Sequence, residues 1–139
     1  MGKHKGGKGG TIVNISSAVG LALHPSIPVY TATKHGVIGF SLCMQANYAK
    51  TGVRFLTLCP GKTKSKMASE FYATKYDFVD QKVDLELWER FPTQEPENVG
   101  LGLIDTIQKG KNGAIIVVEN DIPAYAVEIP YYPTMATSW

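Results

Sequence analysis

Two side chains in this sequence, Tyr30 and Lys34, have the types and the spacing needed for acid–base chemistry. Positions i and i+4 share one face of a helix, so a phenol and an ammonium group placed there can approach each other. Free tyrosine, with a pKa of about 10, is a poor base at neutral pH, but a neighbouring lysine cation favours the phenolate. A serine, Ser17, precedes Tyr30 by thirteen residues. Together the three predict a site that moves a proton to or from a hydroxyl group.

The spacing Tyr-x-x-x-Lys is weak by itself, because such pairs also arise by chance on solvated helices. Its surroundings are more specific. An apolar segment ends in Asn14-Ile15-Ser16-Ser17, a loop follows, the Tyr–Lys pair stands near a helix start, and a second apolar segment ends in Pro60-Gly61. The order of these segments favours a catalytic role for Tyr30 and Lys34 over a chance pair on a solvated helix.

Three apolar segments that must position these residues are predicted strands, at 11–15, 53–59 and 114–118. Their nearly continuous apolar and β-branched content is typical of parallel strands covered on both faces. A helix is expected over 29–50, with apolar stripes on two faces, and ends at Gly52.

A second helix is expected to begin at Glu95-Pro96-Glu97, with carboxylates in its first turn, and to end at Gly110. Asn112-Gly113 then forms a turn into the last strand. The expected apolar face of this helix is formed by Val99, Leu103, Ile104 and Ile107.

The alternation of strands and helices predicts one α/β domain with parallel strands and right-handed crossovers. Ser17 then lies at the carboxyl edge of the sheet, where ligands of α/β proteins bind. Residues 1–10 are expected to form a flexible basic lead-in and 62–92 one or two short surface helices. The Tyr- and Pro-rich tail at 119–139 is expected to be irregular.

Composition excludes several classes of function. The 139 residues carry 14 Lys and Arg against 12 Asp and Glu, a net charge of +2 that is too small to favour nucleic acid. No apolar run reaches the length of a membrane span, and the N-terminus lacks the apolar stretch of a signal peptide. The two cysteines and three histidines match no disulfide framework and no metal site, so we expect a cytoplasmic protein without a metal.

Three segments in this order, NISSAVG, PVYTATKHGVIGFS and GVRFLTLCPGKTKS, resemble the short-chain dehydrogenase/reductase family. The resemblance runs from about Gly10 to Val118. The segments YTATKHGVIGF and NGAIIVV look closest to its branch of NAD-linked 15-hydroxyprostaglandin dehydrogenase and insect alcohol dehydrogenases. It implies the C-terminal half of a doubly wound, Rossmann-like parallel sheet. It also implies an oxidoreductase that interconverts a secondary alcohol and a ketone with NAD as cofactor.

The resemblance also implies roles for individual residues. Tyr30 would be the general acid and base, and Lys34 would favour its ionised form and hold the nicotinamide ribose. Ser17 would form a hydrogen bond with the substrate oxygen. Pro60-Gly61 would lie against the nicotinamide, with Thr63 near its carboxamide. The segment 64–92 would cover the substrate.

Two residues depart from the family pattern. Lys62 stands where an apolar residue is usual, and it either alters the packing of the nicotinamide or points into solvent. Cys59 replaces a frequent Asn and is expected to be a small buried residue.

Tyr72, Trp88 and the aromatic tail either line an apolar pocket or form core and dimer contacts.

Three features of the family's N-terminal half have no match in this sequence: the Gly-rich turn, the residue that recognises the ribose, and a helical Asn of the proton relay. We therefore expect the catalytic half of a longer enzyme, whose strand 11–15 has an unpaired apolar edge, and a homodimer through helix 29–50. The alternative is a catalytically inactive truncated fragment acting as a binding or assembly module. A storage-type relative is a third, weaker interpretation.

Overall fold

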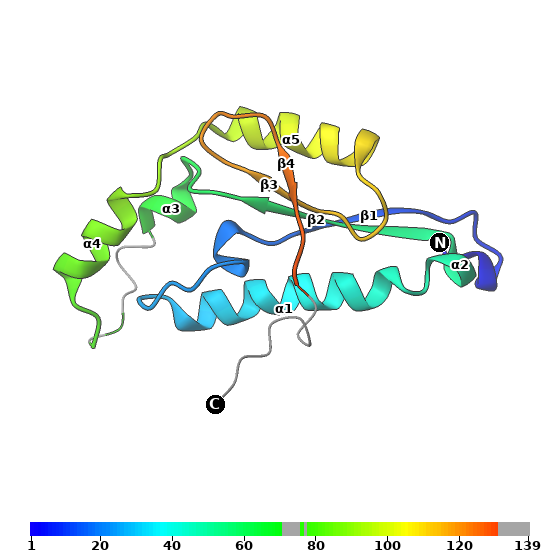
Figure 1. Ribbon diagram of the computed structural model, residues 1–139, viewed down its shortest axis with the longest axis horizontal. Helices are drawn as coiled ribbons and strands as arrows, with labels where there is room; N and C mark the ends of the chain where they lie inside the picture. Colours follow the sequence, from blue (N-terminus) through cyan, green and yellow to red (C-terminus); the bar gives the residue numbers. More distant parts are fainter. Residues whose placement is uncertain (71–75, 77, 131–139) are drawn as a thin grey trace.

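The computed structural model describes residues 1–70, 76 and 78–130 and shows a four-stranded sheet between helices (Figure 1). The strands are β1 (Gly10–Ile15), β2 (Val53–Pro60), β3 (Ile115–Val118) and β4 (Tyr125–Val127), and they are neighbours in that order. The α-helices are α1 (Pro28–Gln45), α2 (Tyr48–Thr51), α3 (Lys66–Glu70), α4 (Gln81–Glu89) and α5 (Pro96–Lys109). Short 3-10 turns lie at Lys3–Lys5 and Ala18–Gly20. The predicted α/β class is confirmed.

The core is built around β2, which is paired in parallel with β1 on one side and β3 on the other. Leu56 and Leu58 are completely buried, and Ile38 of α1 is 2% exposed. Each such side chain contributes roughly 1.5–3 kcal/mol by leaving water. Figure 1 shows α1 and α5 on opposite sides of the sheet, so both of its faces are covered.

The first strand differs from its expectation as a buried strand. No residue of β1 is buried, and Ile15 is 46% exposed. The reason is its position, because β1 pairs with β2 alone among the described residues. A sequence typical of a central strand therefore stands at a sheet edge, which leaves the unpaired apolar edge that was expected.

The predicted helix 29–50 is divided in two. The helix α1 ends at Gln45, and α2 begins at Tyr48 after Ala46-Asn47. The side chain of Asn47 donates to the Cys43 carbonyl at 3.4 Å, the kind of local bond by which Asn competes with the helix. Gly52 ends α2 as expected, with a φ of +62° that favours glycine.

The face of α5 that packs on the sheet matches the predicted one only in part, since Val99 and Leu103 are half-buried. Gly102 and Thr106 are buried, whereas Ile104 and Ile107 are 51% and 44% exposed. A Cβ at Gly102 would meet a Val118 methyl at 2.4 Å, so this glycine lets α5 approach β3 closely. Close backbone approach, rather than the larger apolar side chains, thus sets the rotation of this helix.

The strand β4 lies in the segment that was expected to be irregular. It pairs antiparallel with β3, so the sheet has four strands rather than about three. The turn between them contains Asn120 and Asp121 at φ values of 64° and 52°. Asn and Asp tolerate this left-handed region best after glycine. Tyr72 and residues 131–139 lie outside the described residues.

Candidate active site

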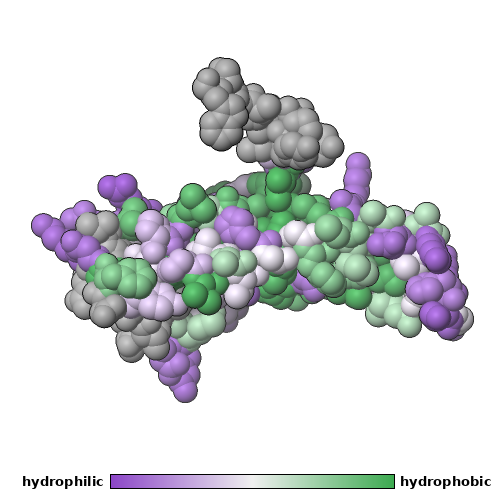
Figure 2. Space-filling model, turned by 90° about the horizontal axis from the view of Figure 1, so that it is seen from below, coloured by the Kyte–Doolittle hydropathy of each residue, from purple (hydrophilic) through white to green (hydrophobic). Residues whose placement is uncertain are grey.

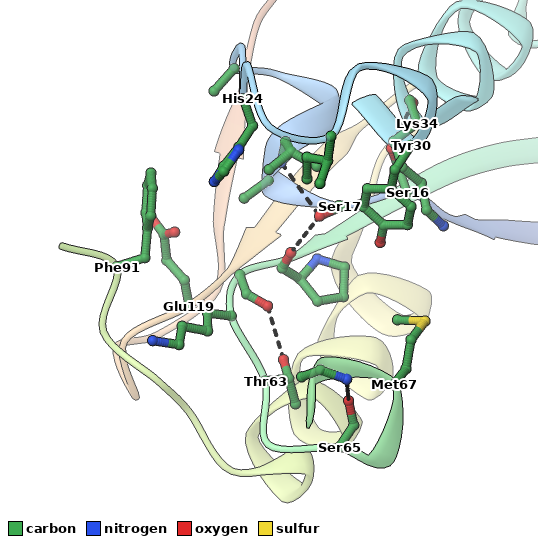
Figure 3. A pocket seen from close by; sticks show the side chains of 18 of the residues that line it. Ser16, Ser17, His24, Tyr30, Lys34, Thr63, Ser65, Met67, Phe91 and Glu119 are labelled. Atoms are coloured by element: carbon green, nitrogen blue, oxygen red, sulfur yellow. Dashed lines mark hydrogen bonds between the residues drawn. The ribbon is translucent and has the colours of Figure 1, made fainter. Parts of the chain in front are cut away.

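All six residues assigned to the site from the sequence line one pocket of about 400 Å³. The pocket lies at the carboxyl ends of β1 and β2. Figure 3 shows Ser17, Tyr30 and Lys34 along one wall, with Thr63, Ser65 and Met67 across from them. The remaining two of the six are Pro60, the last residue of β2, and Gly61, directly after it. The fold therefore brings together residues from 17 to 63 of the sequence.

Tyr30 and Lys34 stand in the first two turns of α1, which starts at Pro28. Proline suits the first helical position because its missing N–H would have no helical partner there. The Lys34 ammonium lies 5.4 Å from the centre of the Tyr30 ring and donates to the Ile15 carbonyl at 3.2 Å. The end of β1 thus holds the lysine cation beside the phenol.

The two adjacent serines have different surroundings. Ser16 is buried, and its hydroxyl donates to the Lys34 carbonyl at 2.8 Å, which fastens α1 to the end of β1. Ser17 is half-buried, and its hydroxyl takes part in two long contacts of 3.4 Å, to the Pro60 carbonyl and from the Val19 N–H. Bonds of this length are weak, so the Ser17 hydroxyl can exchange them for a ligand in the pocket.

Cys59 lies beneath the two serines and is completely buried, as expected from its type. Burial raises the pKa of its thiol to about 11, against smaller lowering effects of Ser16, Ser17 and Lys34. A thiol with this pKa stays protonated near neutral pH and is inert as a nucleophile. Cys59 therefore packs in the core with Ile38 and Val117 and takes no part in the chemistry of the site.

Of the two interpretations of Lys62, a side chain that points into solvent is not what the structure shows. Its effect on the packing of the nicotinamide stays a prediction. Its ammonium group donates to the Trp88 carbonyl at 3.2 Å and lies 4.9 Å from the centre of the Trp88 ring. Trp88 also contacts His24, whose ring centre is 6.4 Å away in an edge-on arrangement. All three residues line the pocket, so Lys62 connects the loop after β2 to α4 across it.

The rest of the pocket wall is mainly apolar. It includes side chains from the loop before α1, from the segment 64–92 and from α5: Leu23, Ile27, Met67, Phe91 and Val99. Met67 and Phe91 belong to the segment expected to cover the substrate. Figure 3 shows Phe91 on the far side of the pocket from Tyr30.

Sequence reasoning missed Gln94, a residue completely buried beside the loop after β2. Its side-chain amide donates to the Thr63 hydroxyl at 3.2 Å and to the Val118 carbonyl at 2.7 Å. The sequence indicates only an ordinary helix cap at a polar residue just before a helix, and nothing in the spacing of Gln94 indicates burial.

Sequence reasoning also missed Ser65, whose hydroxyl lines the pocket and accepts a hydrogen bond from the Ala68 N–H at 3.1 Å.

Two findings limit the kinds of site present. Across residues 1–70, 76 and 78–130, no three His, Cys, Asp or Glu side chains gather as metal ligands would. None of the helices in the same residues combines the length and the apolar character that a membrane crossing requires.

The family model described as short chain dehydrogenase matches residues 1–75, more than half of the chain. The chain belongs to the short-chain dehydrogenase family. The chain is 40% identical over 119 residues to alcohol dehydrogenase 1 of Ceratitis cosyra, a match that covers 84% of this chain and 46% of the relative. It is 36% identical over 124 residues to rat (Rattus norvegicus) 15-hydroxyprostaglandin dehydrogenase (NAD(+)), covering 85% and 47%.

Solved structures share the fold. A short chain dehydrogenase from Mycobacterium paratuberculosis bound to NAD superposes with a TM-score of 0.59 at 24% identity, covering 84% of this chain and 46% of that one. The 4-hydroxyisoleucine dehydrogenase complexed with NADH gives 0.59 at 20% identity, covering 78% and 45%. The chain thus spans about half the length of the relatives that it matches.

Proposed function

We propose that this chain provides the catalytic half of an NAD-dependent oxidoreductase that interconverts a secondary alcohol and a ketone. One observation carries the proposal: Ser17, Tyr30 and Lys34 meet in a single pocket at the carboxyl edge of the parallel sheet. The names of the relatives, alcohol dehydrogenase and 15-hydroxyprostaglandin dehydrogenase, support the same reaction class. The mainly apolar wall suits a small organic alcohol as substrate.

The residues present fit the nicotinamide end of the cofactor. Lys34 supplies a cation for the ribose hydroxyls, and Pro60 supplies a flat apolar surface. Thr63 supplies a hydroxyl with one acceptor site left, as its hydrogen goes to the Gly61 carbonyl at 3.0 Å and Gln94 donates to it. We assign only the nicotinamide and its ribose to these residues. NAD is preferred over NADP because the rat relative is named NAD-linked.

In the proposed reaction, Tyr30 takes the proton of the alcohol hydroxyl and Ser17 holds its oxygen by a hydrogen bond. Lys34, fixed against the Ile15 carbonyl, stabilises the ionised phenol by its charge. Bound NAD supplies the acceptor for the hydride of the carbinol carbon. In the reverse direction Tyr30 returns the proton to the ketone oxygen.

Titration of the isotopically labelled chain with nicotinamide mononucleotide tests the proposal. We expect NMR shift changes that cluster at Ser17, Lys34 and Thr63. Changes confined to another surface, or none at tens of millimolar nucleotide, would refute the assignment of the pocket. A millimolar dissociation constant is expected, because this probe omits the adenosine and pyrophosphate contacts that tighten dinucleotide binding.

We also propose a homodimer through α1. Its Val29 and Phe40 are 61% and 56% exposed, and Figure 2 shows hydrophobic side chains gathered over the middle of the face on which α1 lies. Sedimentation of the wild type and of Phe40→Asp tests this, since the charge should shift a dimer to monomer. A sedimentation coefficient that is monomeric in both refutes it.

A cytoplasmic location is proposed because both cysteines are free, Cys43 on the surface and Cys59 in the core. Fractionation of cells that express the protein tests it.

A further inference from the structure

Gln94 connects three parts of the molecule through its side chain and its backbone. The side-chain amide nitrogen donates to the Val118 carbonyl at the end of β3 and to the Thr63 hydroxyl. The amide oxygen accepts from the Asn98 side chain in the first turn of α5 at 2.6 Å. The direction of the amide is thereby fixed, because turning it over would place its oxygen against the Val118 carbonyl.

The backbone of Gln94 forms an isolated parallel bridge with Thr63. The Gln94 N–H donates to the Lys62 carbonyl at 2.9 Å, and the Lys64 N–H donates to the Gln94 carbonyl at 3.0 Å. In such a bridge the central residue presents its own N–H and C=O on the opposite side. The main-chain N–H of Thr63 is therefore directed away from Gln94 and offers a donor.

The Thr63 hydroxyl is oriented by the same residue. A hydroxyl has one hydrogen and two lone pairs. The hydrogen goes to the Gly61 carbonyl at 3.0 Å, and one lone pair accepts from Gln94 at 3.2 Å. The remaining lone pair can only accept. Thr63 therefore presents an acceptor and a main-chain donor from one residue, which is the complement of a primary carboxamide with its N–H and C=O.

We propose that Gln94 is a positioning residue that fixes Thr63 as a paired donor and acceptor for the carboxamide of nicotinamide. This inference rests on the proposed function, since it assumes that the nicotinamide binds in this pocket. It adds a residue outside the pocket wall, and it assigns the recognition to the direction of the Thr63 hydroxyl rather than to its presence alone.

The affinities of two nucleotides test whether Gln94 controls the recognition of the carboxamide. One is nicotinamide mononucleotide, and the other is its analogue with an acetyl group in place of the carboxamide, which lacks the N–H. The wild-type chain should bind the first three- to ten-fold more tightly, the range expected for one hydrogen bond between neutral groups. Gln94→Met keeps the length of the side chain and the backbone bridge but loses the amide, so its two dissociation constants should agree within two-fold.

The matched control is Thr106→Val. Thr106 is also buried, and its hydroxyl donates to the Gly102 carbonyl at 2.7 Å, in the second half of α5. This variant should lose stability and keep the preference for the carboxamide. Thr63→Val should lose the preference, and adding Gln94→Met to it should have no further effect. Thr63→Val alone keeps the test decisive if Gln94→Met unfolds, because a Thr63→Val chain that still prefers the carboxamide overturns the inference.

A measurement without ligand separates this inference from the proposed function. Three-bond couplings should show one Thr63 side-chain rotamer in the wild type and averaging in Gln94→Met. An unchanged rotamer, or a preference for the carboxamide that survives in Gln94→Met, overturns the inference while leaving the proposed function intact. A wild-type chain that binds neither nucleotide at Ser17, Lys34 and Thr63 overturns the proposed function itself.

Discussion

The Lys34 ammonium lies 5.4 Å from the centre of the Tyr30 ring while it donates a hydrogen bond to the Ile15 carbonyl. The lysine is therefore not a freely rotating surface side chain. Its charge is held between the last residue of β1 and the first turn of α1, so the sheet and the helix together place it beside the phenol. A change in either element would move the cation relative to the tyrosine.

Replacement of Tyr30 by Phe should abolish turnover and leave nucleotide affinity nearly unchanged, because only the ionisable group is removed. Loss of a general acid or base typically lowers kcat by about 10²- to 10⁴-fold. Lys34→Ala should weaken both turnover and binding, since two roles are proposed for it. The measurement is the initial rate of NADH formation from a secondary alcohol, with calorimetric titration of NAD, in a form of the protein that carries the complete cofactor site.

Tyr48→Phe is the matched control for this experiment, as Tyr48 is 47% exposed on α2 and outside the pocket lining. It should retain full activity. If Tyr30→Phe keeps more than about a tenth of kcat, a loss of less than about 1.4 kcal/mol, Tyr30 is not the general base.

Two glycines of α5 should respond in opposite ways to the same substitution. Gly102→Ala puts a methyl group where a Val118 methyl stands 2.4 Å away, so α5 must move from the sheet. Overpacking of this kind typically costs about 1–3 kcal/mol. Gly100→Ala meets nothing within 4 Å and should stabilise the helix by about 0.5–1 kcal/mol. Urea unfolding of the two variants measures both effects, and equal midpoints would show that α5 does not pack through Gly102.

The order of the elements was predictable because parallel strands and their crossover helices leave strong local patterns. The apolar segments ending in Ser17 and in Pro60-Gly61 marked β1 and β2, and parallel pairing alone then places their ends at one edge. The site followed from the same reasoning, since Tyr30 lies at the start of the helix between those two strands.

What the sequence did not show depends on contacts between distant residues. The rotation of α5 is set by the fit of Gly102 against Val118, which no periodicity in the helix reveals. The end of α5 is held by Arg54 of β2, whose guanidinium donates to the Gly110 carbonyl at 2.6 Å and the Ile107 carbonyl at 2.7 Å. Such a partner is separated from the helix by more than fifty residues, so local patterns carry no sign of it.

Lys62→Met should loosen α4 without greatly affecting global stability. The substitution removes the bond to the Trp88 carbonyl and the contact with its ring, together worth about 1 kcal/mol or less at a partly exposed site. In a Trp139→Phe background, the Trp88 emission should shift to longer wavelength and the α4 amides should exchange faster. Lys64→Met is the control, because Lys64 pairs with Glu95 on the surface and leaves Trp88 untouched. Identical exchange in the two variants would show that Lys62 does not hold α4.

The stability of the fold should fall as the pH rises from about 9 to about 11, because of Cys59. Burial raises the pKa of its thiol from the ordinary 9.0 to about 11 in the folded chain. Between these values the unfolded chain has lost a proton that the folded chain retains, so the unfolded state binds fewer protons and alkali favours it. The effect is absent below pH 9, levels off above 11 and amounts to roughly 2–3 kcal/mol, at about 1.4 kcal/mol for each pH unit.

Urea unfolding across this pH range, in a Cys43→Ser background, measures that fall with and without Cys59→Ala. Lysines and tyrosines also titrate here, but they are common to both proteins, so the difference between the two curves isolates Cys59. The curves should converge as the pH rises, since only the chain with Cys59 loses this stability. Native Cys59 should also resist iodoacetamide at pH 8, whereas Cys43, which is exposed, should react in the wild type. Parallel curves, or equal alkylation of both thiols, would show that Cys59 is accessible to water in the folded chain.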